Sequence, residues 1–326
     1  MTLRLAALLL FAACAMVAGL LIGGTPVGGG EIAHALSHPH GDGIADRIVW
    51  DLRLPRVCIA AVVGASLAVC GALLQGMLRN PLVDPYLTGV SAASAAAIAI
   101  ALLVGASPAA LPVLGFGAAL GAAVLVAALS RRGSGIDSNR LILAGVSLST
   151  LFAAITTLAI VRARSNDFAG AVVAWLAGSM AGRDWHDLAT VSPYIIVGLA
   201  LSAWSVPVLN ALRAGDTRAR SAGVDLDRAQ WVILAATSLL AASSVVLAGL
   251  VGFVGLIVPH IARRVTGTDA RVMLPACALL GAAFCTFADA ICRWIVAPAE
   301  LPIGVLLAFV GVPSFLYLYL RRTAVR

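Results

Sequence analysis

LPRVCIAAVVGASLAVCGALLQG, residues 54–76, is the stretch that decides the fold class. From residue 57 to residue 76 no side chain is charged. A helix needs about 20 predominantly apolar residues to cross the hydrocarbon core of a bilayer. A soluble protein would have to cover such a helix with a polar surface, so the rest of the chain must show whether that surface exists.

The composition leaves too little polar material for a soluble surface. Of 326 residues, 61% are hydrophobic and 11% are charged, and the mean hydropathy is +1.01. Soluble globular chains carry about 25% charged residues. The solvent of this chain must therefore be largely apolar, and we predict an all-α integral membrane protein.

Similar runs recur along the chain and predict about ten transmembrane helices in a single domain, 1–326. The run 253–262 is too short to span alone and contains Pro259, so we expect a short or broken helix packed within the protein. The first run could be a signal peptide, but its length and the lack of a small-residue cleavage site favour a retained anchor. The polar stretches 24–51 and 162–189 are expected to be loops. The candidate spans are 3–23, 54–76, 89–106, 109–129, 141–161, 190–210, 231–251, 253–262, 272–292 and 302–320.

The arginines predict the orientation. If the N-terminus is cytoplasmic and the spans alternate, the inner side carries Arg4, Arg79, Arg131, Arg132, Arg140, Arg213, Arg218, Arg220, Arg228, Arg263, Arg264, Arg271, Arg321, Arg322 and Arg326. The outer side carries Arg47, Arg53, Arg56, Arg162, Arg164, Arg183 and Arg293. This excess inside agrees with the positive-inside rule. We therefore expect a multi-pass protein of the inner (plasma) membrane with both termini in the cytoplasm.

Two residue types limit the chemistry of the chain. It contains no lysine, and a phosphate-binding P-loop needs one, so any ATP hydrolysis must occur on another subunit. The six cysteines form no C-x-x-C pair and lie in or beside apolar runs, which is typical of small buried hydrophobic residues. They are Cys14, Cys58, Cys70, Cys277, Cys285 and Cys292.

Four segments are too polar, or too rich in helix breakers, for ordinary membrane helices. Irregular backbone at membrane depth is tolerated only where it is buried in protein or lines a cavity. The segment 71–91 is thus a pore-lining turn or a plain cytoplasmic loop. The segment 213–228 is a solvated loop or a short helix that docks on a cytoplasmic partner. The two arginines of 53–56 lie at the outer start of a span, where they could be simple interfacial anchors. The segments are RLPR (53–56), GALLQGMLRNPLVDPYLTGVS (71–91), RAGDTRARSAGVDLDR (213–228) and GLVGFVGLIVPHIARRVTGTDAR (249–271).

In order and spacing, these segments resemble the FecCD-type permeases, the membrane subunits of type II ABC importers for vitamin B12, haem and ferric siderophores. The resemblance covers nearly the whole chain and implies the type II importer permease fold. It is carried by RLPR (53–56), GALLQGMLRNPLVDPYLTGVS (71–91), LILAGVS (141–147), ARSAGVDLDR (219–228), GFVGLIVPHIAR (252–263) and AELPIGVLLAFVGVPSFLYLYLRR (299–322).

The resemblance also implies partners. Two copies of such a permease form the pore, each contacts one ATPase subunit, and a periplasmic binding protein delivers the cargo. ATP and magnesium bind to the ATPase, so this chain is expected to be no enzyme and to hold no cofactor or metal of its own. Transport would proceed by alternating access.

Individual positions match the functional positions of the family. The arginines expected to meet acidic residues of the binding protein are Arg53, Arg56 and Arg293, all on the predicted outer side. The cytoplasmic gate and pathway match Asn80, Pro81, Leu82 and Ser147. The coupling region, about 217–228, transmits the movement of the ATPase through Ala219, Arg220, Ser221, Gly223 and Val224.

The cargo is less well defined. Tyr86 follows Pro85 where several haem and vitamin B12 permeases carry glycine, which favours a siderophore system. Ferric siderophore, haem and cobalamin remain open, in that order of preference. His34, His38 and His40 raise a haem or metal hypothesis, but they lie among Gly, Pro and Ser residues that favour a solvated loop. His260 is a lone histidine, which is more often structural than a metal ligand.

Two other classes of protein fit the sequence less well. An ion-coupled secondary transporter would need ionisable residues near the bilayer centre, and the spans contain almost none. The nearest is Asp289, which could pair with Arg293 four residues later. An intramembrane enzyme would need a catalytic motif, but neither H-E-x-x-H nor G-x-S-x-G nor a pair of aspartates within the spans is present.

Overall fold

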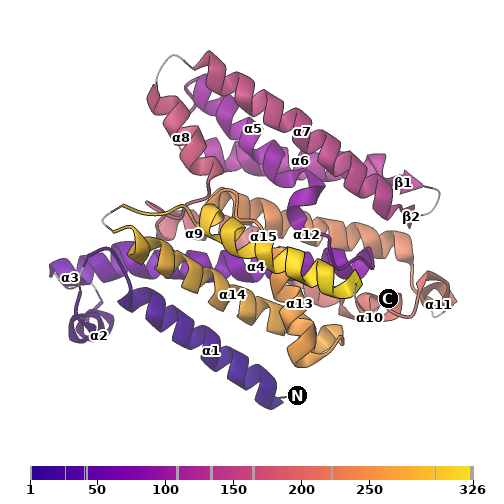
Figure 1. Ribbon diagram of the computed structural model, residues 1–326, viewed down its shortest axis with the longest axis horizontal. Coiled ribbons are helices and arrows are strands. Elements are labelled where there is room, and N and C mark those ends of the chain that lie inside the picture. Colours follow the sequence, from indigo (N-terminus) through magenta and orange to yellow (C-terminus); the bar gives the residue numbers. More distant parts are fainter. Residues whose placement is uncertain are drawn as a thin grey trace.

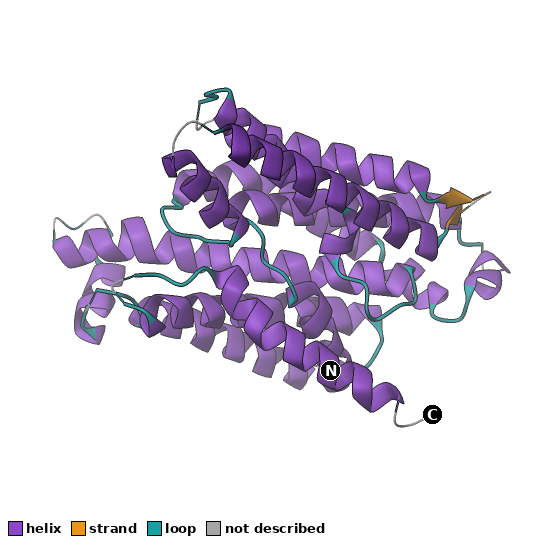
Figure 2. Cartoon of the chain, turned by 45° about the horizontal axis from the view of Figure 1, so that its top comes forward, coloured by secondary structure: helices purple, strands orange, loops and turns teal. Residues whose placement is uncertain are grey.

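A computed structural model of the chain describes residues 2–323 except positions 26, 40, 42, 108–109, 133–134, 164–165, 222 and 298. The described residues form a bundle of helices (Figures 1 and 2). Besides the helices they contain one small antiparallel hairpin, β1 (Arg131–Arg132) paired with β2 (Gly135–Ile136). The predicted all-α class is therefore confirmed except for this hairpin.

Seven helical segments of the described chain are long and apolar enough to cross a membrane, and each overlaps one predicted span. In the second of them, α3 (Ile44–Arg47) and the π-helix η1 (Ile48–Arg53) run without a break into α4 (Leu54–Met77). The other six are α1 (Thr2–Leu21), α6 (Leu111–Leu129), α7 (Ser138–Arg162), α9 (Trp185–Trp204), α12 (Leu226–Ala248) and α14 (Ala270–Ile295).

Three further predicted spans are helices with shorter apolar parts. At 1.5 Å per residue, the 14 residues of α5 (Val90–Leu103) extend about 21 Å, less than the ~30 Å hydrocarbon core. The helix is therefore shorter than the predicted span 89–106 and does not reach across the hydrocarbon core. The short, buried helix expected at 253–262 is confirmed as α13 (Val254–Thr266), with Pro259 inside it. In α15 (Ile303–Thr323) the described apolar part ends at Ser314.

The two stretches expected to be loops contain helices, so those predictions were wrong. In the first, α2 (Gly29–Ser37) buries Ile32 and Ala35 against Val49, and Trp50 Nε1 donates to the Ala35 carbonyl. In the second, α8 (Asn166–Leu176) packs Val172 against α5 and α7. Few of the side chains whose burial is described in these two helices are buried, so their apolar periodicity was too brief to recognise. The remaining short helices are η2 (Pro85–Thr88), α10 (Val206–Leu212) and α11 (Asp216–Ser221).

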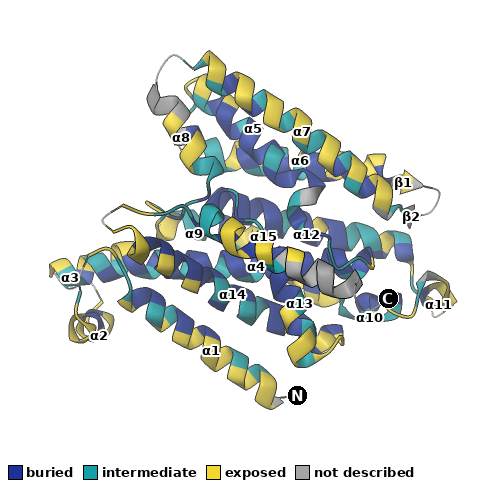
Figure 3. Ribbon diagram, in the orientation of Figure 1, coloured by how far each residue is buried: buried dark blue, intermediate teal, exposed yellow. Residues whose placement is uncertain are grey.

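The core lies around α4 and α12, which are mostly buried, whereas α1, α7 and α9 expose much of their apolar surface (Figure 3). Exposed apolar surface of this kind is expected where a helix faces lipid or packs against another membrane helix. Helices α5, α6 and α7 form one group that packs on α12, and α1, α13 and α14 gather around α4 (Figure 1). The bundle has two ends, which we call the α2–α3 end and the α10–α11 end.

Glycines let α4 touch two helices backbone to backbone. A Cβ on Gly71 would overlap the carbonyl oxygen of Gly255 at the start of α13, and one on Gly64 would overlap that of Gly281 in α14. Close approach of this kind is how helices gain packing energy where lipid offers no hydrophobic drive. It fixes α4 against the two helices that follow α12 in sequence.

Candidate functional site

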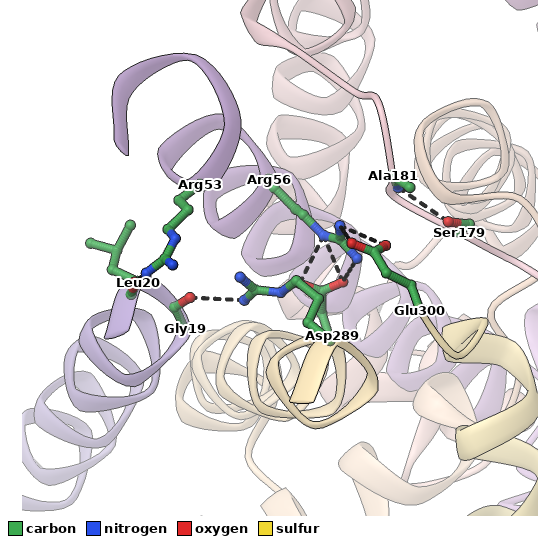
Figure 4. A network of polar contacts seen from close by, with 9 residues as sticks. Gly19, Leu20, Arg53, Arg56, Ser179, Ala181, Asp289 and Glu300 are labelled. Atoms are coloured by element: carbon green, nitrogen blue, oxygen red, sulfur yellow. Dashed lines mark hydrogen bonds and ion pairs between the residues drawn. The ribbon is translucent and has the colours of Figure 1, made fainter. Parts of the chain in front are cut away.

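The three arginines predicted to dock a binding protein line one cavity at the α2–α3 end, and Figure 4 shows two of them, Arg53 and Arg56. Arg53 ends η1, Arg56 is in the first turn of α4, and Arg293 is in the last turn of α14. Arg53 and Arg293 are each only 4% exposed. Their guanidinium groups donate to carbonyls at the end of α1, Arg53 to Leu20 at 2.6 Å and Arg293 to Gly19 at 2.8 Å.

One carboxylate joins two of these arginines. Asp289 in α14, 2% exposed, accepts from Arg56 Nη2 at 2.9 Å and pairs with Arg293 Nε at 3.0 Å. Arg56 also pairs through Nη1 with Glu300 at 2.9 Å, whose side chain is 40% exposed. The sequence-based pair of Asp289 with Arg293 is confirmed. The share that Arg56 takes in it was missed, because nothing in the chain pattern relates positions 233 residues apart.

All three arginines line a cavity of about 810 Å³. Its opposite wall is the start of α9, with Arg183, Trp185 and His186. Trp185 Nε1 donates to the Trp50 carbonyl at 2.9 Å, which ties this wall to η1. Carboxylates of Asp51, Asp184 and Glu300 share the lining, so the cavity is mixed in charge rather than uniformly basic.

The predicted gate residues follow α4 at the other end. Arg79 turns the chain with a left-handed backbone (φ 51°), and the Asn80 Oδ1 accepts from the Leu82 N–H at 3.0 Å, which closes the turn around Pro81. Behind the turn, Gln75 donates to the carbonyls of Val83 and Gly255 and accepts from Arg263.

The gate turn therefore rests on α13 as well as on α4. The predicted partner Ser147 is exposed on α7. η2, which follows the gate turn, packs against α7, and Gly89 directly after η2 lies beside Gly145 and Ser149, on either side of that serine. Among the described residues no hydrogen bond joins Ser147 to 80–82, so its role stays a prediction.

The predicted coupling residues surround the turn between α11 and α12 at the α10–α11 end. Ala219 is buried and Val224 is half-buried, and the Val224 N–H donates to the Ala219 carbonyl at 3.1 Å. Arg220, Ser221 and Gly223 are exposed. Gly223 has φ +81°, a conformation that favours glycine. The short helix that the sequence offered as one of two alternatives for this stretch is α11.

Three residues that the sequence associated with cargo or a metal have structural partners. The Tyr86 hydroxyl accepts the Val251 N–H in the link between α12 and α13, so it holds the fold together at that point. The rings of His34 and His38 are stacked with centroids 4.3 Å apart, and His38 Nδ1 is bonded to the Ser37 hydroxyl at 2.9 Å. His40 lies outside the described residues. Among the described residues, no group of three metal-ligating side chains is present.

Known proteins similar to this chain show the family to which it belongs. A model of the FecCD transport family matches residues 8–321. The chain is 41% identical over 280 residues to the cobalamin import system permease protein BtuC of Halobacterium salinarum, covering 84% of this chain and 73% of that protein. It is 36% identical over 301 residues to the Fe(3+) dicitrate transport system permease protein FecC of Escherichia coli K12, covering 91% and 90%.

A solved structure has the same fold. It is an ABC transporter assigned to the metal-chelate type, in an inward-facing conformation, and it is similar to this chain with a TM-score of 0.87 and 31% identity. The match covers 98% of this chain and 100% of that one.

Proposed function

The chain belongs to the FecCD transport family and is a multi-pass permease of an ABC importer, and we propose that it moves an iron chelate from periplasm to cytoplasm by alternating access. The chelate would be a ferric siderophore or haem. ATP and magnesium would bind to a separate ATPase, because this chain has no lysine for a P-loop.

The observation that carries the choice of cargo is the pair of similarities to metal-chelate systems. The permease named for Fe(3+) dicitrate aligns over 91% of this chain, and the structural neighbour is assigned to the metal-chelate type. Cobalamin is the second candidate, because the permease named for it has the higher identity, 41%. Tyr86, whose presence favours a siderophore system, also has a structural role, since its hydroxyl accepts the Val251 N–H.

The proposed assembly is a homodimer of this chain with two ATPase subunits and one periplasmic binding protein. The exposed apolar faces of α7 and α15 support an additional membrane partner, and the exposed α11 turn supports a cytoplasmic one. We place the α10–α11 end and both termini in the cytoplasm, since most arginines lie on that side. The cavity at the α2–α3 end would then face the binding protein.

A secondary transporter is a poorer explanation. The nearest ionisable candidate for ion coupling, Asp289, is already held by Arg56 and Arg293. Its oxygens are therefore engaged in ion pairs and are not available to bind a coupling cation.

The test is uptake into liposomes that contain this chain with its ATPase and binding protein. Ferric siderophore, haem and cobalamin are offered separately. ATP-dependent accumulation of an iron chelate, lost when the binding protein is omitted, is the expected result. Accumulation of cobalamin alone would replace the cargo, and failure of the chain to assemble with any ATPase would overturn the proposed assembly.

Docking needs a separate variant, because Arg53 and Arg293 are buried and their reversal would disturb the fold. Arg56 has the more accessible guanidinium, and Arg56→Gln removes its charge without placing another carboxylate beside Asp289 and Glu300. It should sharply lower uptake that depends on the binding protein while assembly with the ATPase persists. Arg47→Gln is the matched control, since Arg47 is exposed at the same end and does not line the cavity. Normal uptake with Arg56→Gln would remove the docking assignment.

A further inference from the structure

A second cavity, of about 500 Å³, lies at the α2–α3 end, where the start of α9 faces α5 and α6. The ends of α5, α8 and α12 and the first turn of α6 complete its walls. Its volume is within the range of about 300–1,000 Å³ that is typical of small-molecule sites. Arg183 and His186 line this cavity and also the larger one that holds Arg56, so one short stretch of chain separates the two.

Most of the wall of this second cavity is apolar. Leu102 of α5, Leu111 of α6 and Val246 of α12 line it. The half-buried Trp175 at the end of α8 adds a large aromatic ring. Such a wall favours a ligand with an apolar part, because apolar surface gains free energy when it leaves water.

Exposed apolar surface continues from the cavity along α9 and α6. Thr190 lines the cavity, and Tyr194 and Val197 follow it at four and seven residues, which places all three on one face of α9. Tyr194 and Val197 are exposed, and the Tyr194 ring packs against Phe116 of α6 with centroids 4.4 Å apart. The faces that support a second copy of the chain lie on α7 and α15, so this stripe on α6 and α9 is left facing lipid.

The polar groups of the cavity come from one stretch, 183–190. Arg183 Nη1 donates to Asp187 Oδ1 at 3.3 Å, and the two side chains are 25% and 24% exposed. Asp187 Oδ2 also accepts the Asp184 N–H at 3.3 Å, as part of the N-cap of α9. A carboxylate offers about four acceptor positions and a guanidinium offers several N–H groups, so both can bind a ligand as well as each other. The rim of the cavity therefore presents a cation and an anion side by side.

We propose that this cavity binds the headgroup of a phospholipid that carries both a phosphate and a primary ammonium, such as phosphatidylethanolamine. Arg183 binds the phosphate through paired N–H groups, and Asp187 accepts hydrogen bonds from the ammonium. A choline headgroup has no N–H to donate to Asp187, and a purely anionic headgroup has no cation to place beside it. The acyl chains lie along the apolar stripe of α6 and α9. The leaflet, though not the binding itself, rests on the orientation proposed above, which makes it the outer one.

The lipid site has a consequence for the larger cavity. Arg183 and His186 line both cavities, and Trp185 between them donates to the Trp50 carbonyl of η1. A headgroup held by Arg183 therefore fixes the start of α9, which is the wall opposite the docking arginines. This consequence, unlike the binding itself, rests on the docking function proposed above.

The experiment measures lipid binding by the full chain, purified in a neutral detergent, by native mass spectrometry. Phosphatidylethanolamine, phosphatidylcholine and phosphatidylglycerol with the same acyl chains are titrated separately, with and without soluble glycerophosphoethanolamine as a competitor. Asp187→Asn removes the group assigned to the ammonium, and Arg183→Gln removes the group assigned to the phosphate. The matched controls are Asp51→Asn and Arg47→Gln, which remove exposed charges at the same end that do not line this cavity.

The wild-type chain and both controls should bind phosphatidylethanolamine about fivefold more tightly than phosphatidylcholine, since the added contact is a partly exposed ion pair. Asp187→Asn should abolish this preference and leave the binding of phosphatidylcholine unchanged, which also shows that the variant is folded. Arg183→Gln should weaken the binding of both lipids about fivefold.

Three results would count against the proposal. An unchanged preference in Asp187→Asn would overturn the site. Binding of phosphatidylglycerol as tight as that of phosphatidylethanolamine would overturn the headgroup assignment. Complete displacement of the lipid by glycerophosphoethanolamine would overturn the lipid in favour of a soluble ligand. Because no transport is measured, failure here leaves the proposed import function untouched.

Discussion

The two carboxylates that hold Arg56 should differ strongly in what their loss costs. Both Asp289 and Glu300 pair with its guanidinium at 2.9 Å, so the geometry alone does not separate them. Their burial does, since the side chain of Asp289 is 2% exposed and that of Glu300 is 40% exposed. We therefore compare Asp289→Asn with Glu300→Gln, which remove one charge each and keep the shape.

The expected loss of stability in Asp289→Asn follows from the positive charges that remain without a partner. Without the Asp289 charge, Arg56 and Arg293 remain as two largely buried cations with side chains 12% and 5% exposed. Removing one partner of a buried ion pair costs ~3–5 kcal/mol. Arg56 keeps Glu300 and Arg293 keeps the Gly19 carbonyl, so we expect the lower value, about 3 kcal/mol. Glu300→Gln breaks an exposed pair and should cost less than about 1 kcal/mol.

The assay is denaturant unfolding of the purified chain in detergent, followed by circular dichroism, with the free energy of unfolding compared between variants. Asp187→Asn is the control, because its pair with Arg183 is partly exposed and should also be worth less than about 1 kcal/mol. The reasoning is refuted if the loss of unfolding free energy caused by Asp289→Asn lies within about 1 kcal/mol of the loss caused by Glu300→Gln. It would mean that water reaches the two arginines as freely as it reaches Glu300.

Three further substitutions test the interior and the coupling turn. Gly71→Ala should destabilise the chain by about 3 kcal/mol, because its Cβ would overlap the backbone of Gly255 and neither backbone can rotate away; unfolding in detergent measures it. Tyr86→Phe should lower the free energy of unfolding by about 1–3 kcal/mol, because the Val251 N–H loses its acceptor. It should leave the cargo preference in the uptake assay unchanged. A changed preference would show that Tyr86 contributes to the choice of cargo. Gly223→Ala should strain the turn by about 1–2 kcal/mol at φ +81°, and should lower the cargo moved per ATP hydrolysed in liposomes; an unchanged ratio would contradict a role in coupling.

Hydropathy predicted the long helices well because a bilayer demands one property over a fixed length. It said much less about which faces meet. Gly117 and Gly121 have the four-residue spacing that is typical of closely packed membrane helices, yet a Cβ at either would meet no atom within 4 Å in the described chain. The close contact lies instead between Gly64 and Gly281, which no local spacing connects. Small residues at regular intervals show that a helix can be approached closely, and only the tertiary fold shows where it is.

The arginines of the candidate site show a similar division. Motif order placed Arg53, Arg56 and Arg293 at one end, and they do line one cavity. Nothing in the sequence indicated that Arg53 and Arg293 bind carbonyls of α1, because those acceptors are backbone atoms present at every residue. Nor did any pattern indicate that Arg79, Arg213 and Arg263 line one cavity at the α10–α11 end. Those three arginines are separated along the chain and come together only through the packing of α4, α10 and α13.

Helix α4 connects the two ends, and its packing suits it to transmit movement between them. Its first turn carries Arg56 in the cavity at the α2–α3 end, and its last residues lead to the predicted gate turn at Asn80. Between them, the Gly64 and Gly71 contacts leave no side chain to yield between α4 and its neighbours. A close-packed interior transmits displacement rather than absorbing it. A shift of Arg56 along the axis of α4 would therefore reach the gate turn, and the Gln75 bonds would carry it on to α13.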